Sequence, residues 1–391
     1  MTAVLVVWRD TLWQIFTYRP ALMVMVLSLV VYGLLYPQPY LTETLRDIPV
    51  ALVDQDGSVS SRELTRRLGA TEAVQIAGIF PDLVAAEQAL FARRVHGVVY
   101  IPQGFERDML RGGATTLALY ADASYFLRCQ RLSTGVNTVA RGLGVEVEMG
   151  RLVAQGVAPT LALAEVDPLP LVLVPLFNPQ GGYASYLLPA AFVLILQQTL
   201  MMGAGLLATR REPSAQRADV TGGNGWRNLL GQALAYVSLY AFLIPLFLQG
   251  VPGWYGLPAL GSLGMLLWVA LPFVLAAAFL GLLIAAWLER GELVQLVLLG
   301  IGLPFFFLSG FAWPSDAMPG WIVFLAQWVP STPAIDALVR VTQMGATMTD
   351  VVWQVLQLWG LALFYGVLLV MIQSRRAPDH GVTGEAHPQG E

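Results

Sequence analysis

The chain has 391 residues, of which 56% are hydrophobic and 12% are charged, and its mean hydropathy is +0.62. Soluble globular proteins carry about 25% charged residues, so this composition is that of a membrane protein and excludes an ordinary soluble domain. The net charge of −4 provides no basic surface for a nucleic acid, and we expect no nucleic acid as a partner.

The basic residues exclude further functions, because all 22 are arginines and the chain contains no lysine. A Walker A loop needs its lysine to reach the nucleotide phosphates, and pyridoxal phosphate needs a lysine for its Schiff base. The single cysteine, Cys129, permits no internal disulfide, and His96, His380 and His387 are too scattered to predict a metal site. We therefore expect no catalytic residues, no metal and no cofactor, and we do not expect an enzyme.

The N-terminal part predicts a short helix followed by a membrane span. Residues 4–18 combine aromatic and aliphatic side chains with few charges, which suits a helix lying in the membrane interface, and we assign 1–20 to it. Residues 21–36 form the first predicted transmembrane helix. It ends in the bulky sequence YGLLYP rather than a small-residue cleavage site, so we predict an uncleaved anchor.

Residues 37–183 predict a small α/β domain, because strand and helix patterns alternate. The apolar run 48–53 is typical of a strand covered on both faces. Further predicted elements are a helix with capping-box spacing at Ser60 and Glu63 that runs to Leu68, a helix at 81–91, and strands at 96–101 and 115–120. From Ser124 onward, a long amphipathic helix is indicated by helical spacing of Leu132, Val136, Val139 and Leu143.

The sequence ALVDQDGS at 51–58 ends this first strand with two carboxylates, Asp54 and Asp56. A calcium loop of the EF-hand type needs glycine at its sixth position, whereas Gly57 comes fourth. A phosphotransferase would need a lysine to neutralise the phosphate. We therefore predict a turn in which Asp, Gly and Ser cap and bend the chain. The arginines nearby predict a solvated helix face, with a patch for an anionic substrate as the alternative: Arg62, Arg66, Arg67, Arg93 and Arg94.

Residues 184–373 predict a five-helix transmembrane domain, followed by a cytoplasmic tail at 374–391 that we expect to be disordered. The predicted spans, each with the roughly 20 apolar residues that a bilayer demands, are about 184–208, 229–248, 259–288, 293–313 and 352–372. The third of these is long enough to require tilt, a kink near Pro272 or an interfacial extension.

The arginines predict the orientation of these spans. With the N-terminus inside, the cytoplasmic segments hold Arg9, Arg19, Arg210, Arg211, Arg217, Arg227, Arg290, Arg375 and Arg376, and the short external loops hold Arg340. Both termini are therefore expected in the cytoplasm. The predicted fold is an α-helical polytopic membrane protein of the bacterial inner membrane, with six transmembrane helices and an α/β extracytoplasmic domain inserted between helices 1 and 2.

Two features of the spans are candidates for a translocation pathway. Gln197, Gln198 and Thr199 lie midway along the second span, where polar side chains face the bundle interior and either touch substrate or bond neighbouring helices. The second feature is a turn that contains Ser309, Gly310, Phe311 and Pro314. Further prolines prevent a continuous helix there, so residues 309–340 are expected to line or cover the outer mouth, with an ordinary external loop as the alternative.

Several motifs in this order resemble the type-2 ABC transporter permease family. They are ALVDQDGSVSSREL at 51–64, FNP at 177–179, YLLP at 186–189, LSGFAWP at 308–314, MP at 318–319 and WVP at 328–330, with Ala337 and Arg340 at matching places. The resemblance covers nearly the whole chain. It implies that the turn at 308–314 closes the fifth span and leads through short re-entrant helices to the sixth.

The resemblance also implies a coupling helix in the loop 209–228, where an ATP-binding subunit would dock. The family's Glu-Arg-Gly-Thr-like signature is replaced here by REPS after Arg210, although Glu212 keeps its place. The candidate contacts are Arg210, Arg211, Glu212, Arg217 and Arg227, and the alternative is that the arginines only set topology.

Together these features predict the permease subunit of an ATP-binding cassette exporter. Its expected partners are separate ATP-binding subunits, a second permease subunit in a homodimer or heterodimer and the lipid bilayer, and an extracytoplasmic adaptor protein is a further candidate. The alternative function is a membrane-anchored receptor or assembly scaffold that transports nothing. Drugs, lipids, polysaccharide precursors and peptides all stay open as substrates.

Overall fold

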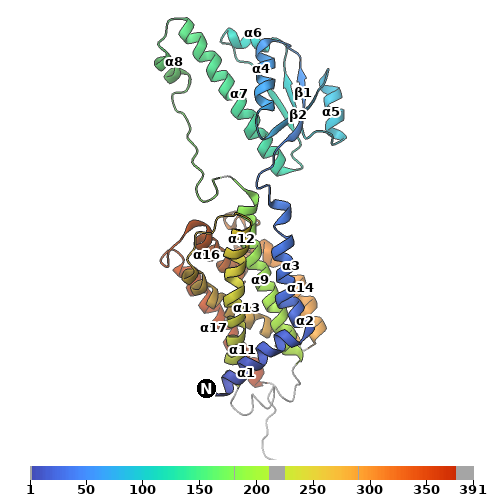
Figure 1. The fold of residues 1–391 in the computed structure, drawn as a ribbon, viewed down its shortest axis with the longest axis vertical. Coiled ribbons are helices and arrows are strands. Elements are labelled where there is room, and N and C mark those ends of the chain that lie inside the picture. Colours follow the sequence, from blue (N-terminus) through green and yellow to red (C-terminus); the bar gives the residue numbers. More distant parts are fainter. Residues whose placement is uncertain (1, 180, 211–224, 289, 376–391) are drawn as a thin grey trace, which may run out of the picture. The chain divides into compact units, whose positions relative to one another are not determined.

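The computed structural model describes residues 2–179, 181–210, 225–288 and 290–375 (Figure 1). The chain divides into two compact units. The helical unit comprises residues 1–43 and 175–391, and the sheet unit comprises residues 44–174.

The sheet unit contains a mixed sheet with the strand order β2-β1-β3-β4. β1 pairs in parallel with β2 and β3, and β4 is antiparallel to β3. The strands are β1 (Ile48–Asp54), β2 (Val74–Ile79), β3 (Gly97–Ile101) and β4 (Ala118–Ala121). The helices are α4 (Val59–Gly69), α5 (Leu83–Phe91), α6 (Phe105–Leu110), α7 (Phe126–Ala154) and α8 (Pro159–Val166).

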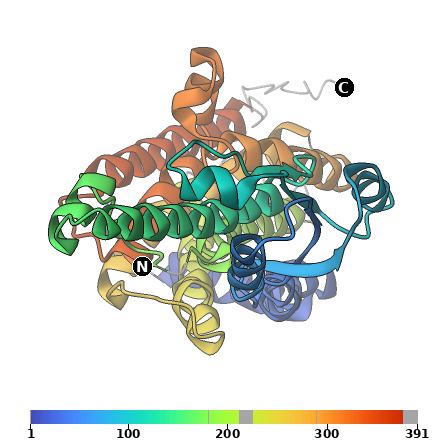
Figure 2. The same cartoon turned by 90° about the horizontal axis from the view of Figure 1, so that it is seen from above.

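Both faces of this sheet are covered by helices. α4 and α7 bury one face, where Leu52 packs in a cluster with Leu64 and Leu132, and α5 covers the other, where Val53 packs with Ala86. Figures 1 and 2 show α5 on one side of the strands and α4 and α7 on the other. The continuous apolar run of β1 is therefore explained, and its prediction as a strand covered on both faces is confirmed.

Two predictions within the sheet unit need correction, and one strand was missed. The last strand begins at Ala118 rather than at residue 115, because the chain reaches β3 only there. The N-cap of α4 is Ser58 rather than Ser60, since the Ser58 side chain accepts a hydrogen bond from the backbone N–H of Ser61. β2 was not predicted, because it buries little besides Val74 and has no continuous apolar run.

The helical unit contains, among the described residues, six helices that are long and apolar enough to cross a membrane. A bent pair of helices raises that number to seven if it is counted as one span. The candidate spans are Arg19–Tyr40, Tyr183–Arg210, Gly225–Trp254, Leu263–Leu288, Gly291–Leu308 and Val352–Gln373.

These spans contain the following elements. The first span comprises α2 (Arg19–Leu22), a π-helical segment (Met23–Leu27), α3 (Ser28–Leu35) and a 3-10 turn (Gln38–Tyr40). The third comprises α11 (Gly225–Pro245), a π-helical segment (Leu246–Gly250) and α12 (Val251–Trp254). The others are α9 (Tyr183–Arg210), α13 (Leu263–Leu288), α14 (Gly291–Leu308) and α17 (Val352–Arg375). Shorter helices are α1 (Thr2–Thr17), a 3-10 turn (Ser315–Ala317), α15 (Gly320–Ala326) and α16 (Ser331–Met344).

Two predicted spans run past the ends of their helices, and the span predicted at 229–248 extends from Gly225 to Trp254. The span predicted at 259–288 begins at Leu263, and the span predicted at 293–313 ends at Leu308. Ser262 directly precedes the first of these boundaries, and its Oγ accepts from the Met265 N–H at 3.3 Å, as an N-cap does. Gly310, with a φ of 76°, follows the second, and glycine tolerates the left-handed backbone with which a helix commonly ends.

The core of the helical unit forms where α9 and α13 approach most closely. A Cβ atom placed on Gly281 would lie 2.8 Å from both the Cα and the carbonyl oxygen of Met201, so the absence of a side chain permits this approach. Phe192 of α9 and Phe273 of α13 are fully buried in the surrounding cluster. α9 is consequently the central helix, and most of its apolar window is buried within the unit.

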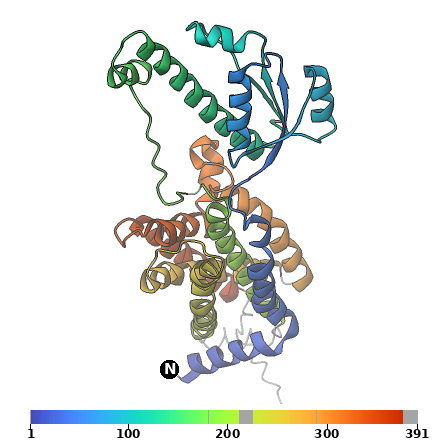
Figure 3. The same cartoon turned by 45° about the horizontal axis from the view of Figure 1, so that its top comes forward.

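The helix α1 packs against α11 and lies at a steep angle to the long spans (Figures 1 and 3). The Trp8 indole donates a hydrogen bond to Ser238 Oγ at 3.0 Å. A Cβ atom on Gly231 would come within 2.6 Å of Val7 Cβ, so glycine at this position permits the close contact. The predicted helix at residues 4–18 is confirmed.

Candidate functional site

The middle of α9 carries a polar layer inside the helical unit. Gln197 is 1% exposed, and its Nε2 donates to Ser331 Oγ of α16 at 3.2 Å. Its Oε1 is also buried but makes no hydrogen bond within the described residues. Because a buried acceptor without a partner is costly, Gln197 is the one residue of this layer that invites a role beyond helix packing.

The two neighbouring polar residues have protein partners. The Gln198 amide donates to the carbonyl oxygen of Leu298 on α14. Thr199 Oγ1 lies 3.1 Å from the buried Tyr240 hydroxyl of α11. The predicted residues Gln197, Gln198 and Thr199 are consecutive, and each forms a hydrogen bond to a different helix, α16, α14 and α11 respectively.

A second contact between α9 and α14 was not anticipated. Gln295 Nε2 of α14 donates to the carbonyl oxygen of Met202 on α9 at 3.0 Å. Together with the bond from Gln198 it forms a pair in which each helix donates to a carbonyl of the other. Helix–helix hydrogen bonding therefore accounts for most of the polarity of the layer.

The predicted turn at 309–314 ends α14. Ser309 Oγ donates to the carbonyl oxygen of Phe306 at 2.6 Å and accepts from the Phe311 N–H at 3.3 Å. Gly310 has a φ of 76°, a conformation that glycine adopts at little cost. The structure shows a turn at these predicted residues and ends α14 at Leu308 rather than at residue 313, and Pro314 follows as the residue before a short 3-10 turn.

An aromatic contact ties this turn to the start of α9. The rings of Phe311 and Tyr186 stack with centroids 4.4 Å apart. The Tyr186 hydroxyl also donates to the carbonyl oxygen of Phe311 at 2.9 Å. Farther on, α15 and α16 are bent by 79° at their junction, so residues 309–340 contain no continuous span.

Sequence reasoning missed a polar cluster between α16 and α17. Asp336 accepts from Arg340 Nε at 2.7 Å and from Gln354 Nε2 at 2.6 Å. Arg340, predicted to lie in a short loop, is thus half-buried on a helix. Asp336 is 4 positions from Arg340 and 18 positions from Gln354 in the sequence, and only the packing of the two helices brings Gln354 into the cluster.

Sequence reasoning also missed Glu43, which holds the start of α9. Its carboxylate accepts from the Ser185 hydroxyl at 2.8 Å, and its carbonyl oxygen accepts from the Tyr183 N–H at 2.8 Å. A Cβ atom on Gly182 would fall 1.7 Å from Glu43 Oε2, so only glycine fits there. The Asn178 of the FNP motif brackets the same glycine, donating to its carbonyl at 2.8 Å and accepting from its N–H at 3.0 Å.

Two of the predicted partner contacts are described, Arg210 at the end of α9 and Arg227 near the start of α11. The Arg210 guanidinium lies over the Tyr18 ring, 4.1 Å from its centroid, and Arg227 lies 5.3 Å from the Trp226 ring centroid. Cation–π contacts of this kind hold a charged side chain against an apolar surface. Arg211, Glu212 and Arg217, with the predicted coupling helix, lie outside the described residues.

The carboxylates of the 51–58 sequence perform the structural role predicted for them. Asp54 Oδ1 accepts from the Asp56 and Gly57 N–H groups at 3.0 Å each, and Oδ2 accepts from Ser61 Oγ at 2.7 Å. Asp56 accepts from the Gly104 N–H at 2.8 Å. Hydrogen bonds from Ser58 and from the α6 backbone hold the pKa of Asp56 below its usual range. Both carboxylates therefore organise the turn.

Two of the nearby arginines, Arg66 and Arg67, form ion pairs with side chains of their own unit. Arg66 and Arg67 both contact Glu63, with N–O distances of 2.7 Å. Arg67 also reaches Glu146 of α7 at 2.7 Å, and Arg62 donates to the carbonyl oxygen of Gly57 at 2.6 Å. These contacts favour the structural interpretation of this arginine-rich face over an anion-binding patch.

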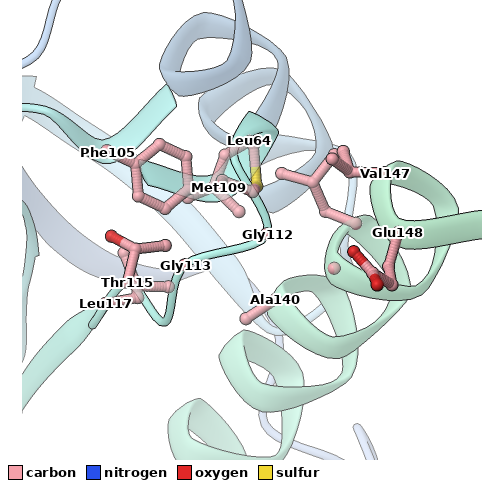
Figure 4. Close-up of a pocket in the computed structure, with 12 residues that line it drawn as sticks. Leu64, Phe105, Met109, Gly112, Gly113, Thr115, Leu117, Ala140, Val147 and Glu148 are labelled. Atoms are coloured by element: carbon pink, nitrogen blue, oxygen red, sulfur yellow. The ribbon is translucent and has the colours of Figure 1, made fainter. Parts of the chain in front are cut away.

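The sheet unit also contains a pocket of about 290 Å³ between α4, α6 and α7 (Figure 4). Leu64, Phe105, Met109 and Val147 supply apolar walls. Its carboxylate, Glu148, is already paired with Arg151, whose Nε donates to it at 2.8 Å. The pocket therefore suits the binding of a small apolar group better than it suits catalysis. Within the described parts of the chain, no group of three His, Cys, Asp or Glu residues could hold a metal ion.

Comparison with known proteins decides the class of this chain. A family model described as ABC-2 family transporter protein matches residues 11–371. The chain belongs to the ABC-2 transporter family. The match covers both units, and it confirms the resemblance to type-2 ABC transporter permeases that the motifs indicated.

Relatives in this ABC-2 family carry a transport description. The "Probable multidrug ABC transporter permease YbhR" of Escherichia coli strain K12 is 19% identical over 340 residues, which are 86% of this chain and 88% of that protein. The protein of the same description from Escherichia coli O157:H7 has the same identity and coverage. An ABC-2 permease is a polytopic membrane subunit of a transporter, and this family implies an ATP-binding subunit as its general partner.

Proposed function

We propose that this chain is the membrane subunit of an ATP-driven exporter and forms the translocation pathway as a dimer with a second permease subunit. Separate ATP-binding subunits would supply the energy. The family match over residues 11–371 carries this proposal. It is supported by the apolar helices of the helical unit and by the absence of lysine, without which the chain cannot build a Walker A loop.

The proposed arrangement places residues 37–183 outside the inner membrane of a bacterial cell and both termini in the cytoplasm. The arginine distribution supports this orientation. Residues 1–20 would then lie in the inner interface, residues 21–36 would form the first span and residues 184–373 the five-helix domain. The contact of α1 with α11 suits a helix that lies along the cytoplasmic ends of the spans.

We assign α9 as the element that links the two ends of the pathway. At one end Arg210 contacts Tyr18. Arg210 is one of the proposed contacts with the ATP-binding subunit, and the others are Arg211, Glu212, Arg217 and Arg227. At the other end Tyr186 holds the turn at Phe311. Gln197, whose buried side-chain oxygen has no hydrogen-bond partner in the described parts of the chain, lies between them and is the proposed pathway residue. The 309–340 segment would form the outer gate.

The substrate class to test first is small apolar or amphipathic compounds, because the relatives named YbhR carry the description "Probable multidrug ABC transporter permease". The experiment is co-purification of the chain with candidate ATP-binding subunits from the same organism, followed by ATPase measurement in lipid. We expect a stable complex whose ATPase activity depends on this chain and responds to such compounds. A chain that binds a partner through its sheet unit but recruits no ATP-binding subunit would instead be a receptor or scaffold.

The proposed coupling contact can be tested separately. Removing one member of a desolvated charge pair costs about 2–5 kcal/mol of binding free energy, whereas an exposed pair costs little. Glu212→Ala, or the double change Arg210→Ala and Arg211→Ala, should therefore weaken assembly or uncouple ATPase activity from transport. Tyr18→Leu is the matched control, since it removes the internal partner of Arg210 and keeps the charge. Normal assembly and coupling in both arginine and glutamate variants would assign these residues to topology alone.

A further inference from the structure

Residues 168–177, which we call the apolar strap, have the sequence PLPLVLVPLF. Residues 170–176 lie outside any helix or strand. Their side chains are nonetheless large and apolar, and the exposed fractions are 88% for Leu169, 86% for Leu171, 78% for Val172, 81% for Leu173, 67% for Val174 and 69% for Leu176. Soluble proteins rarely leave such a continuous apolar surface in water, and where they do it marks a binding surface.

The charge distribution indicates which environment covers the strap. No charged residue occurs from 168 to 209, so the uncharged character of α9 extends without interruption back through the strap. The segment that connects the first span to β1 is different in composition, because it carries the charged residues Glu43, Arg46 and Asp47 soon after the span. The strap is therefore continuous in composition with a membrane span.

Proline placement argues against a protein strand as the partner. Pro168, Pro170 and Pro175 have no N–H to donate, which leaves only residues 171–174 between prolines for regular pairing. Burial in the hydrocarbon core is excluded as well, because an extended backbone there would leave its polar groups unsatisfied. The membrane interface meets both requirements, since headgroup water solvates the backbone while apolar side chains enter the acyl boundary.

The end of the strap is held close to the start of α9. Asn178 and Gly182 exchange the two hydrogen bonds described above, and the helix begins at Tyr183. Tyr183 contacts Tyr40, with ring centroids 5.5 Å apart, and tyrosines of this kind gather at membrane interfaces. An extended chain spans about 3.3 Å per residue. Every residue of the strap can therefore reach the membrane interface from the start of α9.

We propose that the apolar strap is a membrane-binding segment that lies in the lipid interface beside the start of α9. Its leucine and valine side chains enter the outer part of the acyl region, and its backbone stays at the level of the headgroups. The proposal requires α9 to be a span but does not depend on ATP-driven export or on the orientation of the chain.

A matched pair of valines provides the test. Val174 of the strap is 67% exposed and Val59 of α4 is 68% exposed. Full-length Val174→Cys and Val59→Cys variants are made with Cys129→Ala, labelled with an environment-sensitive fluorophore and placed in phosphatidylethanolamine and phosphatidylglycerol nanodiscs. The discs contain lipid with a nitroxide either at the headgroup or deep in the acyl chain.

We expect a blue shift and strong quenching for the Val174 probe only, and stronger quenching by the headgroup nitroxide, because interfacial segments insert by about 5–10 Å. Equal behaviour of the two probes would overturn the proposal. A blue-shifted but unquenched Val174 probe, with disulfide formation between two unlabelled Val174→Cys chains, would show that a second copy covers the strap instead. An absence of ATPase coupling would leave the result unaffected, so the two proposals fail separately.

Discussion

The Asp54 carboxylate illustrates how a single residue can look catalytic and serve as a cap. It accepts three hydrogen bonds from its own strand-to-helix turn, from Asp56, Gly57 and Ser61. These bonds satisfy donors that the strand leaves unpaired as it ends, so the carboxylate does for the turn what an N-cap does for a helix. Two neighbouring aspartates after a buried strand therefore reflect a turn as readily as an active site.

Loss of this carboxylate should destabilise the sheet unit without affecting transport directly. Asp54→Ala leaves the N–H groups of Asp56 and Gly57 without their partner, while the Ser61 hydroxyl keeps the Ser58 carbonyl oxygen at 3.1 Å. We expect a loss of about 1–3 kcal/mol in the free energy of unfolding. The measurement is a urea titration followed through the ¹⁹F resonance of a trifluoromethyl tag on Cys129, the single thiol of the chain. Asp108→Ala is the control, because Asp108 forms an exposed pair with Arg107 and exposed pairs contribute little to stability. Equal losses would show that Asp54 does not organise the turn.

The ion pairs between α4 and α7 predict how acid affects the sheet unit. Hydrogen bonds from Arg66 and Arg67 hold the pKa of Glu63 at about 2, and a hydrogen bond from Arg67 lowers the pKa of Glu146. A glutamate has a pKa of about 4.3 in an unfolded chain, so the unfolded state binds protons first as the pH falls. The contribution of these pairs to stability is therefore complete above about pH 5 and is lost as the pH falls towards 2.

We expect the urea midpoint reported by the same ¹⁹F tag to fall steadily between about pH 5 and pH 3. Glu63→Gln should flatten this dependence, because the glutamine cannot bind the proton. If the Glu63→Gln chain instead loses stability in parallel with the original chain as the pH falls, the acid sensitivity belongs to other groups.

At the scale of elements, the helical unit depends on small residues where helices approach closely. Gly281 permits the contact between α13 and the backbone of Met201 on α9, and Gly231 permits that between α11 and α1. Polar side chains then fix which helix lies where, as the bonds from Gln198 and Gln295 do between α9 and α14. Close backbone approach and carbonyl-directed hydrogen bonds are the means by which helices associate inside a membrane, where the hydrophobic effect does not distinguish them from lipid.

Gly281→Ala tests this contact. The added Cβ would lie 2.8 Å from the backbone of Met201, which cannot move as the end of a flexible side chain can. Overpacking of this kind costs about 1–3 kcal/mol, so we expect a lower temperature of irreversible aggregation in detergent, measured by size-exclusion chromatography after heating. Gly264→Ala on the same helix is the control, because its Cβ would meet nothing within 4 Å. A loss of stability in the control but not in Gly281→Ala would contradict the close approach.

At the scale of the whole molecule, the two units follow different rules. The sheet unit buries its apolar residues on the two faces of a sheet and pairs its charges at the surface. The helical unit leaves large side chains such as Leu296 and Leu303 of α14 exposed, 67% and 65% respectively. Exposure of this kind suits a helix whose surroundings are lipid or another subunit, and it agrees with the family assignment.

The orientation of the chain in the membrane can be tested through Cys129. It lies on α7 of the sheet unit and is partly exposed. If residues 37–183 are outside, a membrane-impermeant maleimide should label it in cells whose outer membrane has been made permeable and whose inner membrane is intact. The control is a Cys129→Ala chain carrying a cysteine at the C-terminus, which should be labelled only after lysis. The reverse pattern of labelling would invert the proposed topology.

The amino-acid sequence alone was sufficient to predict the apolar spans, the strand β1, the turn at Ser309 and Gly310, and the family. Each of these depends on a local property: a run of apolar residues, a residue that cannot continue a helix, or an ordered set of short motifs. The span ends at 259 and 313 were misplaced, because apolar composition continues past residues where the backbone leaves the helix.

Only the tertiary structure decided what the polar residues do. Glu43 holds Ser185 from 142 positions away, Gln354 reaches Asp336 across 18, and Gln197 bonds Ser331 across 134. β2 likewise exists because β1 offers it an edge, although its own side chains carry little apolar signal. A hydrogen bond or a strand pairing belongs to two distant segments at once, and no pattern within one segment contains the position of its partner.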